Sequence, residues 1–187
     1  MNRGTILVTG GAGYIGSHTV LQLRARGERV VVLDDLSRGF RQAVLDTPLV
    51  VGKVGDRETV LNALRTHGVD TVMHFAAYTI VPESVAEPLK YYGNNTCSTR
   101  NLLECCVEAG VRNFVFSSTA AVYGIPTEGY AAETTTTAPI NPYGTSKLMS
   151  EWMLRDVAAS SPMKYVALRY FNVAGSDTGG RVGQATP

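Results

Sequence analysis

Four glycines fall within the eight residues T-G-G-A-G-Y-I-G (Thr9 to Gly16), between the apolar run I-L-V and an amphipathic segment. Glycine inside regular structure costs roughly 0.5–1 kcal/mol relative to alanine, so such a cluster needs a compensating role. Where a strand is followed by a helix, glycines allow a tight turn, and the helix N-terminus attracts a phosphate. The cluster therefore predicts a strand, a phosphate-binding turn and a helix at the start of the chain.

Short β-branched apolar runs alternate with longer helical stretches along the rest of the chain, which predicts parallel strands joined by crossover helices. Six strands are expected, at residues 5–9, 29–34, 49–51, 71–75, 113–117 and 164–169. Helices with apolar residues every three or four positions are expected at residues 14–26, 56–66, 89–109 and 143–159. The polar segment 123–142, rich in threonine and proline, predicts a long surface loop. The expected fold is α/β, a Rossmann-like doubly wound parallel sheet.

The length and the charge balance narrow the function. The 187 residues suffice for one domain with its own core and not for a second complete one. With 17 basic and 16 acidic residues scattered along the chain, no nucleic-acid footprint is visible, so small-molecule partners are expected. The spacing of Cys97, Cys105 and Cys106 fits neither a disulfide framework nor a zinc site. Without a signal-peptide core or an apolar run near ~18 residues, we expect a cytoplasmic protein without membrane contact or metal.

The glycine spacing G-x-x-G-x-x-G is one residue longer than the common dinucleotide fingerprint. Gly10 and Gly13 would let a pyrophosphate approach the backbone, and Gly16 would let the helix pack closely; a purely structural turn is the alternative. Asp34 ends the second strand, where a carboxylate accepts a ribose hydroxyl and repels a 2′-phosphate, so NAD is expected rather than NADP. Arg38 is the one nearby residue that weakens this phosphate argument.

Tyr143 and Lys147, in N-P-Y-G-T-S-K, share a helix face that Asn141 caps and Pro142 begins. An ammonium beside a phenol favours the phenolate. Lowering a tyrosine pKa from about 10 to about 7 takes about 4 kcal/mol, which a lysine and a nicotinamide cation together can supply. Tyr143 is therefore a candidate base, and the alternative is a half-buried tyrosine beside a solvated lysine.

Thr119 follows the fifth strand in F-V-F-S-S-T-A-A-V-Y-G, at the edge where open α/β sheets place ligand-binding groups. A hydroxyl there can relay or accept a proton, although threonine is also common in ordinary turns.

These motifs, together with H-F-A-A, E-S-V-A-E-P-L-K-Y-Y-G-N-N and R-Y-F-N-V-A-G, resemble the extended short-chain dehydrogenase/reductase family in order and approximate spacing. The resemblance covers essentially the whole chain and is closest to the UDP-sugar 4-epimerases of that family. It implies an NAD site with the pyrophosphate at Gly10, Gly13, Tyr14, Ile15 and Gly16, the adenosine ribose at Asp34, and a lining that includes Phe75, Ala76, Ala77, Asn94 and Phe171. It also implies that Thr119 and Tyr143 are the catalytic pair, that Lys147 holds the nicotinamide ribose, and that the substrate is contacted by Thr119, Tyr143 and Asn172.

The implied activity is interconversion of UDP-glucose and UDP-galactose by transient oxidation at C4 with bound NAD. The family commonly dimerises through two helices, here 89–109 and 143–159, so a homodimer is expected. Other UDP-sugars, such as UDP-xylose, UDP-arabinose or a UDP-N-acetylhexosamine, and a silent NAD-binding protein remain alternatives. A dehydratase would need an acid and a base where this chain has Thr119-Ala120-Ala121, and a serine hydrolase would need the missing G-x-S-x-G elbow.

Three departures from the family pattern bear on these expectations. Lys53 stands where an aspartate usually meets the adenine, and a lysine cannot accept the amino proton. Tyr78 and Thr79 occupy a segment in which some epimerases carry a lysine near the pyrophosphate. The chain ends where the family continues into a substrate lobe, so residues 1–187 are expected to be an NAD-binding domain with little turnover alone.

Overall fold

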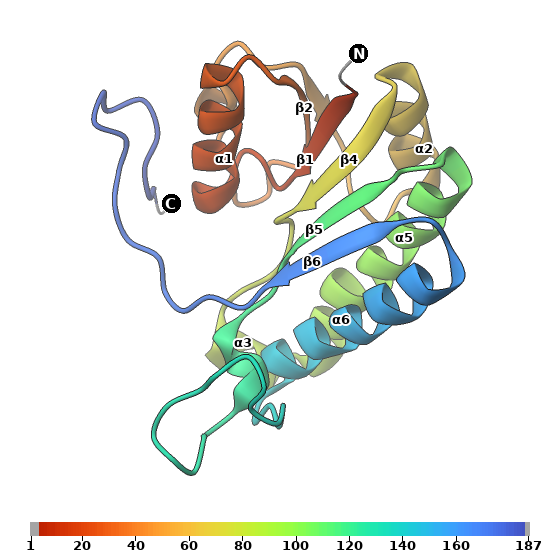
Figure 1. Ribbon diagram of the computed structural model, residues 1–187. Coiled ribbons are helices and arrows are strands. Elements are labelled where there is room, and N and C mark those ends of the chain that lie inside the picture. The colour runs from red at the N-terminus through yellow and green to blue at the C-terminus, as the bar shows by residue number, and fades with distance from the viewer. Residues whose placement is uncertain (1–3, 186–187) are drawn as a thin grey trace.

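The computed structural model describes residues 4–185, which form a six-stranded parallel sheet with helices on both sides (Figure 1). The strand order is β3-β2-β1-β4-β5-β6. The strands are β1 (Thr5–Thr9), β2 (Arg29–Asp34), β3 (Leu49–Val51), β4 (Val69–His74), β5 (Asn113–Ser117) and β6 (Lys164–Leu168). The order reverses between β1 and β4, which is where ligands bind in open α/β sheets. The predicted doubly wound sheet is confirmed.

Helices cover the two faces of the sheet unequally. Figure 1 shows α1 on one side and α2, α5 and α6 on the other. The α-helices are α1 (Tyr14–Ala25), α2 (Arg57–Thr66), α3 (Val81–Ala86), α4 (Pro88–Tyr91), α5 (Ser98–Ala109) and α6 (Pro142–Ser160), with 3-10 turns η1 (Arg41–Val44) and η3 (Ala120–Tyr123) and the π-helical segment η2 (Tyr92–Cys97). None of the helices described is long and apolar enough to cross a membrane.

Alternating strand residues divide the core into two parts, because successive side chains of a strand point to opposite faces. Leu7, Val31 and Leu33 belong to the larger cluster, which includes residues of α2, α5 and α6. Val8 and Val32 belong to the smaller cluster with Val20 of α1. Both faces of the central strands therefore pack against apolar side chains, and this packing fixes the positions of the strand ends.

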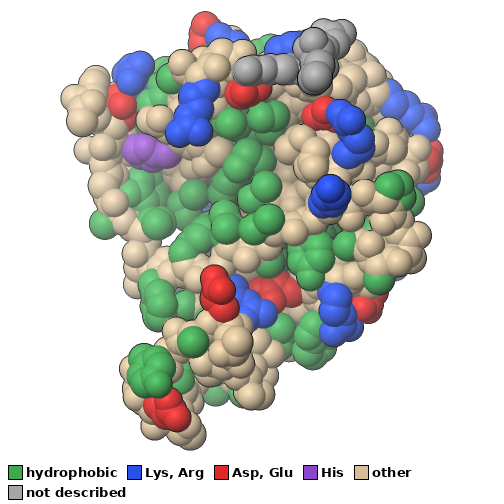
Figure 2. Space-filling view, viewed as in Figure 1, with side chains coloured by type: hydrophobic (Ala, Val, Ile, Leu, Met, Phe, Trp, Pro, Cys, Tyr) green, Lys and Arg blue, Asp and Glu red, His purple; other side chains and the backbone are tan. Residues whose placement is uncertain are grey.

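The outer part of the α1 side of the sheet is left open. Val166 and Leu168 of β6 are 53% and 40% exposed, while the alternate residues Tyr165 and Ala167 pack against the larger core cluster. Figure 2 shows hydrophobic side chains gathered between α1 and the carboxyl-terminal strands. An apolar surface is therefore exposed on this side of the sheet.

The predicted helix 89–109 is present as one continuous helical stretch, in which α4, the π-helical segment η2 and α5 follow one another without a break in helical backbone. In the middle lie Gly93, Asn94 and Asn95, which are poor helix formers. The buried Asn95 side chain is bonded instead to the backbone of Tyr78 and to Ser146. π-Helical turns occur mostly as short bulges inside α-helices. Here the bulge coincides with the buried Asn95 side chain.

The other helices and strands begin and end within one or two residues of the predicted positions, and the short helix α3 was not predicted. Strand β4 is Val69–His74 instead of 71–75, and β6 ends at Leu168 instead of 169. The missed α3 has only six residues, V-P-E-S-V-A, too few to display a helical period. As predicted, Asn141 caps α6 by accepting from the Gly144 amide at 2.8 Å, and residues 124–141 form an irregular loop.

Candidate active site

A cleft of about 1060 Å³ opens along the carboxyl ends of the strands. Its volume lies at the upper end of the roughly 300–1,000 Å³ typical of sites for small ligands. All candidate residues predicted from the sequence line it: Gly10, Gly13, Tyr14, Ile15, Gly16, Asp34, Phe75, Ala76, Ala77, Asn94, Thr119, Tyr143, Lys147, Phe171 and Asn172. The fold thus brings them together, while the role of each remains a prediction.

The glycine turn packs too closely for side chains at two positions. Gly10 has a φ of +68°, and a Cβ there would lie 2.5 Å from the Ala76 amide nitrogen. A Cβ on Gly16 would lie 2.2 Å from the carbonyl oxygen of Gly10, so this glycine packs on the turn itself.

Gly13 differs, because a Cβ there would meet only the Gly10 oxygen at 3.4 Å. Gly13 is the N-cap of α1 and supplies no side-chain cap, and no acidic residue stands in the first turn. The open amides of this helix N-terminus fit a phosphate. The turn therefore fits the pyrophosphate of a dinucleotide.

Asp34 is buried at the end of β2 and bound to backbone on both oxygens. Oδ2 accepts from the Ala12 amide and Oδ1 from the Leu36 amide, each at 2.9 Å. Burial raises the pKa of this carboxyl, against the lowering effect of the two amides. Because each carboxylate oxygen has a second lone pair, Asp34 can still accept a ribose hydroxyl from the cleft.

Lys147 lies on α6 and is only 3% exposed. Its Nζ donates to the carbonyl oxygen of Ser117 at 2.8 Å and lies 4.9 Å from the centre of the Phe116 ring. Burial lowers the pKa of this amine to about 7. An ammonium has three donors, so two remain for a ligand in the cleft.

The predicted lowering of the Tyr143 pKa by Lys147 is not seen. Burial raises the pKa of Tyr143, and a hydrogen-bonding interaction with the Thr119 side chain opposes this rise. Within residues 4–185 no hydrogen bond joins Tyr143 to Lys147, because the lysine donates to Ser117. The chain alone therefore keeps the phenol protonated, and a bound cation would have to supply the lowering.

Thr119 caps η3, and its Oγ1 accepts from the Ala121 amide at 3.1 Å. Tyr170, which the sequence analysis missed, lies beside it: its carbonyl accepts from the Ala120 amide at 3.0 Å, and its hydroxyl is hydrogen-bonded to Ser117. Tyr170 is the tyrosine of the motif R-Y-F-N, and this motif could have indicated it as a residue of the site. The loop that carries Thr119 is thus fixed by contacts to the end of β6.

A second missed feature is a buried ion pair on the same helix face as Tyr143 and Lys147. Glu151 of α6 accepts from Arg169 Nη2 at 2.6 Å and from the Ser118 hydroxyl. The Arg169 guanidinium also lies 5.0 Å from the ring centre of Tyr123. This pair connects α6, the segment after β5 and the end of β6. Glu151 follows Lys147 by four residues, the spacing that could have indicated it.

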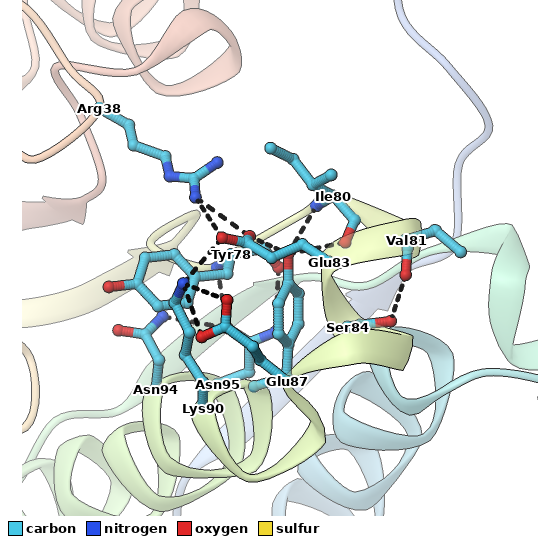
Figure 3. Close-up of polar contacts among 11 residues, drawn as sticks. Arg38, Tyr78, Ile80, Val81, Glu83, Ser84, Glu87, Lys90, Asn94 and Asn95 are labelled. Atoms are coloured by element: carbon cyan, nitrogen blue, oxygen red, sulfur yellow. Dashed lines mark hydrogen bonds and ion pairs between the residues drawn. The ribbon is translucent and has the colours of Figure 1, made fainter.

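The two neighbouring asparagines have different positions in the site (Figure 3). Asn95 is buried and structural: its Oδ1 accepts from the Tyr78 amide at 2.8 Å, and its Nδ2 donates to the Tyr78 carbonyl at 3.0 Å. Asn94 lines the cleft, as predicted, and donates to the Asn95 Oδ1 at 3.1 Å. Tyr78 is thereby fixed at the cleft wall.

The remaining wall contains the residues that depart from the family pattern and an exposed segment after β6. Lys53, Tyr78 and Thr79 all line the cleft. Asp56 also lines the cleft, and its carboxylate caps α2 by accepting from the amides of Glu58 and Thr59. Phe171 and Asn172 lie in the exposed segment, which is held further along by a 2.6 Å bond from the Tyr14 hydroxyl to the Gly175 carbonyl.

Histidines outside the cleft are structural. His74 of β4 is buried between the hydroxyls of Thr9, at 2.6 Å, and Thr99, at 3.0 Å. Within the described residues no group of three His, Cys, Asp or Glu side chains is placed to hold a metal. Cys105 and Cys106 are buried in the larger core cluster, as predicted.

Comparison with known proteins finds relatives that match nearly the whole of this chain. The sequence model of the NAD dependent epimerase/dehydratase family matches residues 6–186. The UDP-glucose 4-epimerase of Azospirillum brasilense is 55% identical over 183 residues, which are 97% of this chain and 53% of that protein. The enzyme of that name from Halalkalibacterium halodurans is 48% identical over 179 residues, 96% of this chain and 54% of the relative.

The fold comparison agrees. The crystal structure of UDP-glucose 4-epimerase from Brucella ovis in complex with NAD superposes with a TM-score of 0.95 at 42% identity, covering 98% of this chain and 56% of that one. The chain thus spans about half the length of the relatives that it matches.

Proposed function

This chain belongs to the NAD dependent epimerase/dehydratase family, and we propose that it uses NAD to invert C4 of a UDP-hexose, interconverting UDP-glucose and UDP-galactose. The observation that carries the proposal is the convergence of Thr119, Tyr143 and Lys147 on the cleft that also holds the glycine turn and Asp34. These groups come from the ends of β1, β2 and β5 and from α6, and one bound dinucleotide would explain why they meet in a single cleft. The names of the relatives supply the UDP-glucose assignment.

The cofactor, when bound, supplies the acceptor and later the donor of the hydride at the sugar C4. Tyr143 removes the proton of the 4-hydroxyl through its phenolic oxygen and returns it after the sugar has turned over. Thr119 interacts with the same phenol and so fixes its direction. Lys147 keeps one N–H on Ser117 and offers the others to the ribose.

Burial of Tyr143 gives the cofactor a second role in this proposal. Because the chain by itself raises the pKa of the phenol, the phenolate forms only when a cation lies nearby. Oxidised nicotinamide is such a cation, so the base becomes active when the hydride acceptor is in place. The same dependence suppresses proton removal in the cofactor-free protein.

An epimerase is favoured over a dehydratase by the residues that follow β5 and by the contacts of Glu151 on α6. Elimination of water needs an acid and a base beside the tyrosine. Glu151 accepts from Arg169 and Ser118 and is therefore occupied. Thr119, Ala120 and Ala121, which line the cleft, carry no carboxylate.

The proposal is tested by adding UDP-glucose to the NAD⁺-loaded chain and recording nicotinamide fluorescence, which rises if the sugar is oxidised. Wild-type protein and Tyr130→Phe are expected to show the rise, since Tyr130 lies exposed in the loop after η3. Tyr143→Phe is expected to bind NADH like the wild type and to show no rise. A wild type that binds both NADH and UDP-glucose without oxidising the sugar, or an equal rise in Tyr143→Phe, would refute the proposal.

We also propose a homodimer through α5 and α6, consistent with their exposed apolar side chains. Val107 of α5 and Trp152 of α6 are each 48% exposed. A groove between these helices and α2 includes Leu103, Val107, Met153 and Val157.

A further inference from the structure

An arginine stands in the loop after β2, where its charge bears on the choice of cofactor. Arg38 lines the cleft four residues after Asp34. An arginine near this position accommodates the 2′-phosphate of NADP, whereas a carboxylate at the end of the strand selects NAD. The two residues therefore favour different cofactors. Where the guanidinium is held decides which of them prevails.

In the structure the Arg38 guanidinium points toward α3 and is bound there (Figure 3). Its Nη2 donates to Glu83 Oε2 at 3.1 Å and to Oε1 at 3.3 Å. Its Cζ also lies 5.1 Å from the centre of the Tyr78 ring, within the range of a cation–π contact. A carboxylate and an aromatic face thus hold the charge at α3.

Glu83 is itself firmly fixed. Its Oε1 accepts from Lys90 Nζ at 2.8 Å and its Oε2 from the Tyr91 hydroxyl at 2.7 Å, so the side chain is 21% exposed. Hydrogen bonds from Lys90 and Tyr91 lower the pKa of Glu83 to about 2, which keeps it charged at neutral pH. Tyr91 is fully buried, and its hydroxyl oxygen also accepts from the Ile80 amide at 3.0 Å.

Asp34 is equally immobile, since two backbone amides hold its carboxylate at the ribose end. The negative charge of Asp34 repels a 2′-phosphate. Only a cation that reaches the 2′ position of the adenosine ribose can offset this repulsion. Lys53 also lines the cleft. The variants used to test Arg38 and Glu83 all keep Lys53, so its effect on cofactor binding is the same in each of them.

We propose that Glu83 is a specificity-determining residue, which excludes NADP by holding Arg38 away from the 2′ position of the adenosine ribose. The inference rests on the proposed NAD-dependent function and extends it to residues of α3 and of the loop after β2. Without the Glu83 charge, Arg38 is free to turn toward a 2′-phosphate and partly offset the repulsion from Asp34.

The test is titration of the purified chain with NADH and with NADPH, followed by nicotinamide fluorescence. Glu83→Gln keeps the shape of the side chain and removes its charge. We expect NADPH to bind this variant about three- to fivefold more tightly than it binds the wild type, the effect of one partly exposed charge contact. NADH affinity is expected to stay within about twofold.

The matched control is Glu87→Gln. Glu87 accepts from the same Lys90, at 3.3 Å, and has the same charge, and within the described part of the chain it forms no hydrogen bond or ion pair with Arg38. It is expected to leave the NADPH-to-NADH ratio unchanged. In the double variant Arg38→Ala/Glu83→Gln the gain in NADPH affinity is expected to disappear. Arg38→Ala alone changes a partly exposed side chain and should leave the ratio near that of the wild type.

Several results would overturn the inference. Equal gains in Glu83→Gln and Glu87→Gln would assign the effect to net charge, and a gain that persists in the double variant would exclude Arg38. A similar loss of both cofactors in Arg38→Ala would place the guanidinium at the pyrophosphate instead. If the wild type binds NADH and Glu83→Gln shows no gain, only this inference fails. If the wild type binds neither cofactor, the proposed function fails as well.

Discussion

Replacing Lys147 with methionine should reduce the pH dependence of stability in the cofactor-free chain. The lysine amine has a pKa of about 7 in the folded protein, against 10.5 for an ordinary lysine. Between these values the unfolded chain binds more protons than the folded one, so the free energy of unfolding rises with pH. From pH 7 to pH 9 the free energy of unfolding should rise by roughly 2 kcal/mol because of this one amine. Below pH 7 the buried amine is charged, and its burial destabilises the folded chain most there.

The assay is urea unfolding at pH 7, 8 and 9, with the stability of Lys147→Met compared with that of the wild type at each pH. Methionine fills similar space without a charge, and the lost bond to Ser117 contributes the same amount at every pH. The difference between the two proteins should therefore shift by roughly 2 kcal/mol in favour of the wild type as the pH rises. Lys164→Met, at an exposed position, is the control and should keep the wild-type slope. A difference that stays constant with pH would refute the buried, desolvated amine.

Three further predictions concern stability and assembly. Burial lowers the pKa of His74 to about 3, so the free energy of unfolding of the wild type should fall by about 1.4 kcal/mol per pH unit below about pH 6.5. The acid unfolding of His74→Gln should therefore depend less steeply on pH. Arg169→Ala should cost about 3–5 kcal/mol in urea unfolding, because Glu151 is left buried and charged, and the Arg169→Met/Glu151→Leu pair should regain much of that loss. Trp152→Glu should convert the proposed dimer to a monomer in sedimentation velocity, with unchanged circular dichroism; a wild type that is already monomeric would refute the dimer.

The sheet and the position of the cleft could be predicted because they depend on local patterns. Apolar runs such as V-V-V-L identify strands, and the glycine turn and the Asn141 cap of α6 identify helix starts. Parallel strands then place their carboxyl ends, and so the candidate residues, at one edge of the sheet. No contact between distant residues was needed for these conclusions.

What the sequence could not provide depends on contacts between distant residues. Arg38 and Glu83 are 45 positions apart, and Glu151 and Arg169 are 18 apart. The widening of the helix at Asn95 follows from its bonds to Tyr78 and Ser146, which no local propensity reveals. The predicted lowering of the Tyr143 pKa involves Lys147 and a nicotinamide cation together and stays a prediction; what the sequence could not reveal is the burial that raises this pKa in the chain alone and the bond of Lys147 to Ser117.

The most direct measurement follows the hydrogen on the sugar C4. UDP-glucose carrying deuterium at C4 is incubated with the NAD⁺-loaded chain, and the cofactor is then released and examined by mass spectrometry. With the wild type, denaturation during the reaction is expected to release reduced cofactor that carries deuterium on the nicotinamide ring, whereas NAD⁺ that has returned the deuteride to the sugar is unlabelled. With Tyr143→Phe no labelled reduced cofactor should appear. The absence of labelled reduced cofactor from wild-type protein that binds both NAD and UDP-glucose would contradict the assignment of this cleft to C4 oxidation.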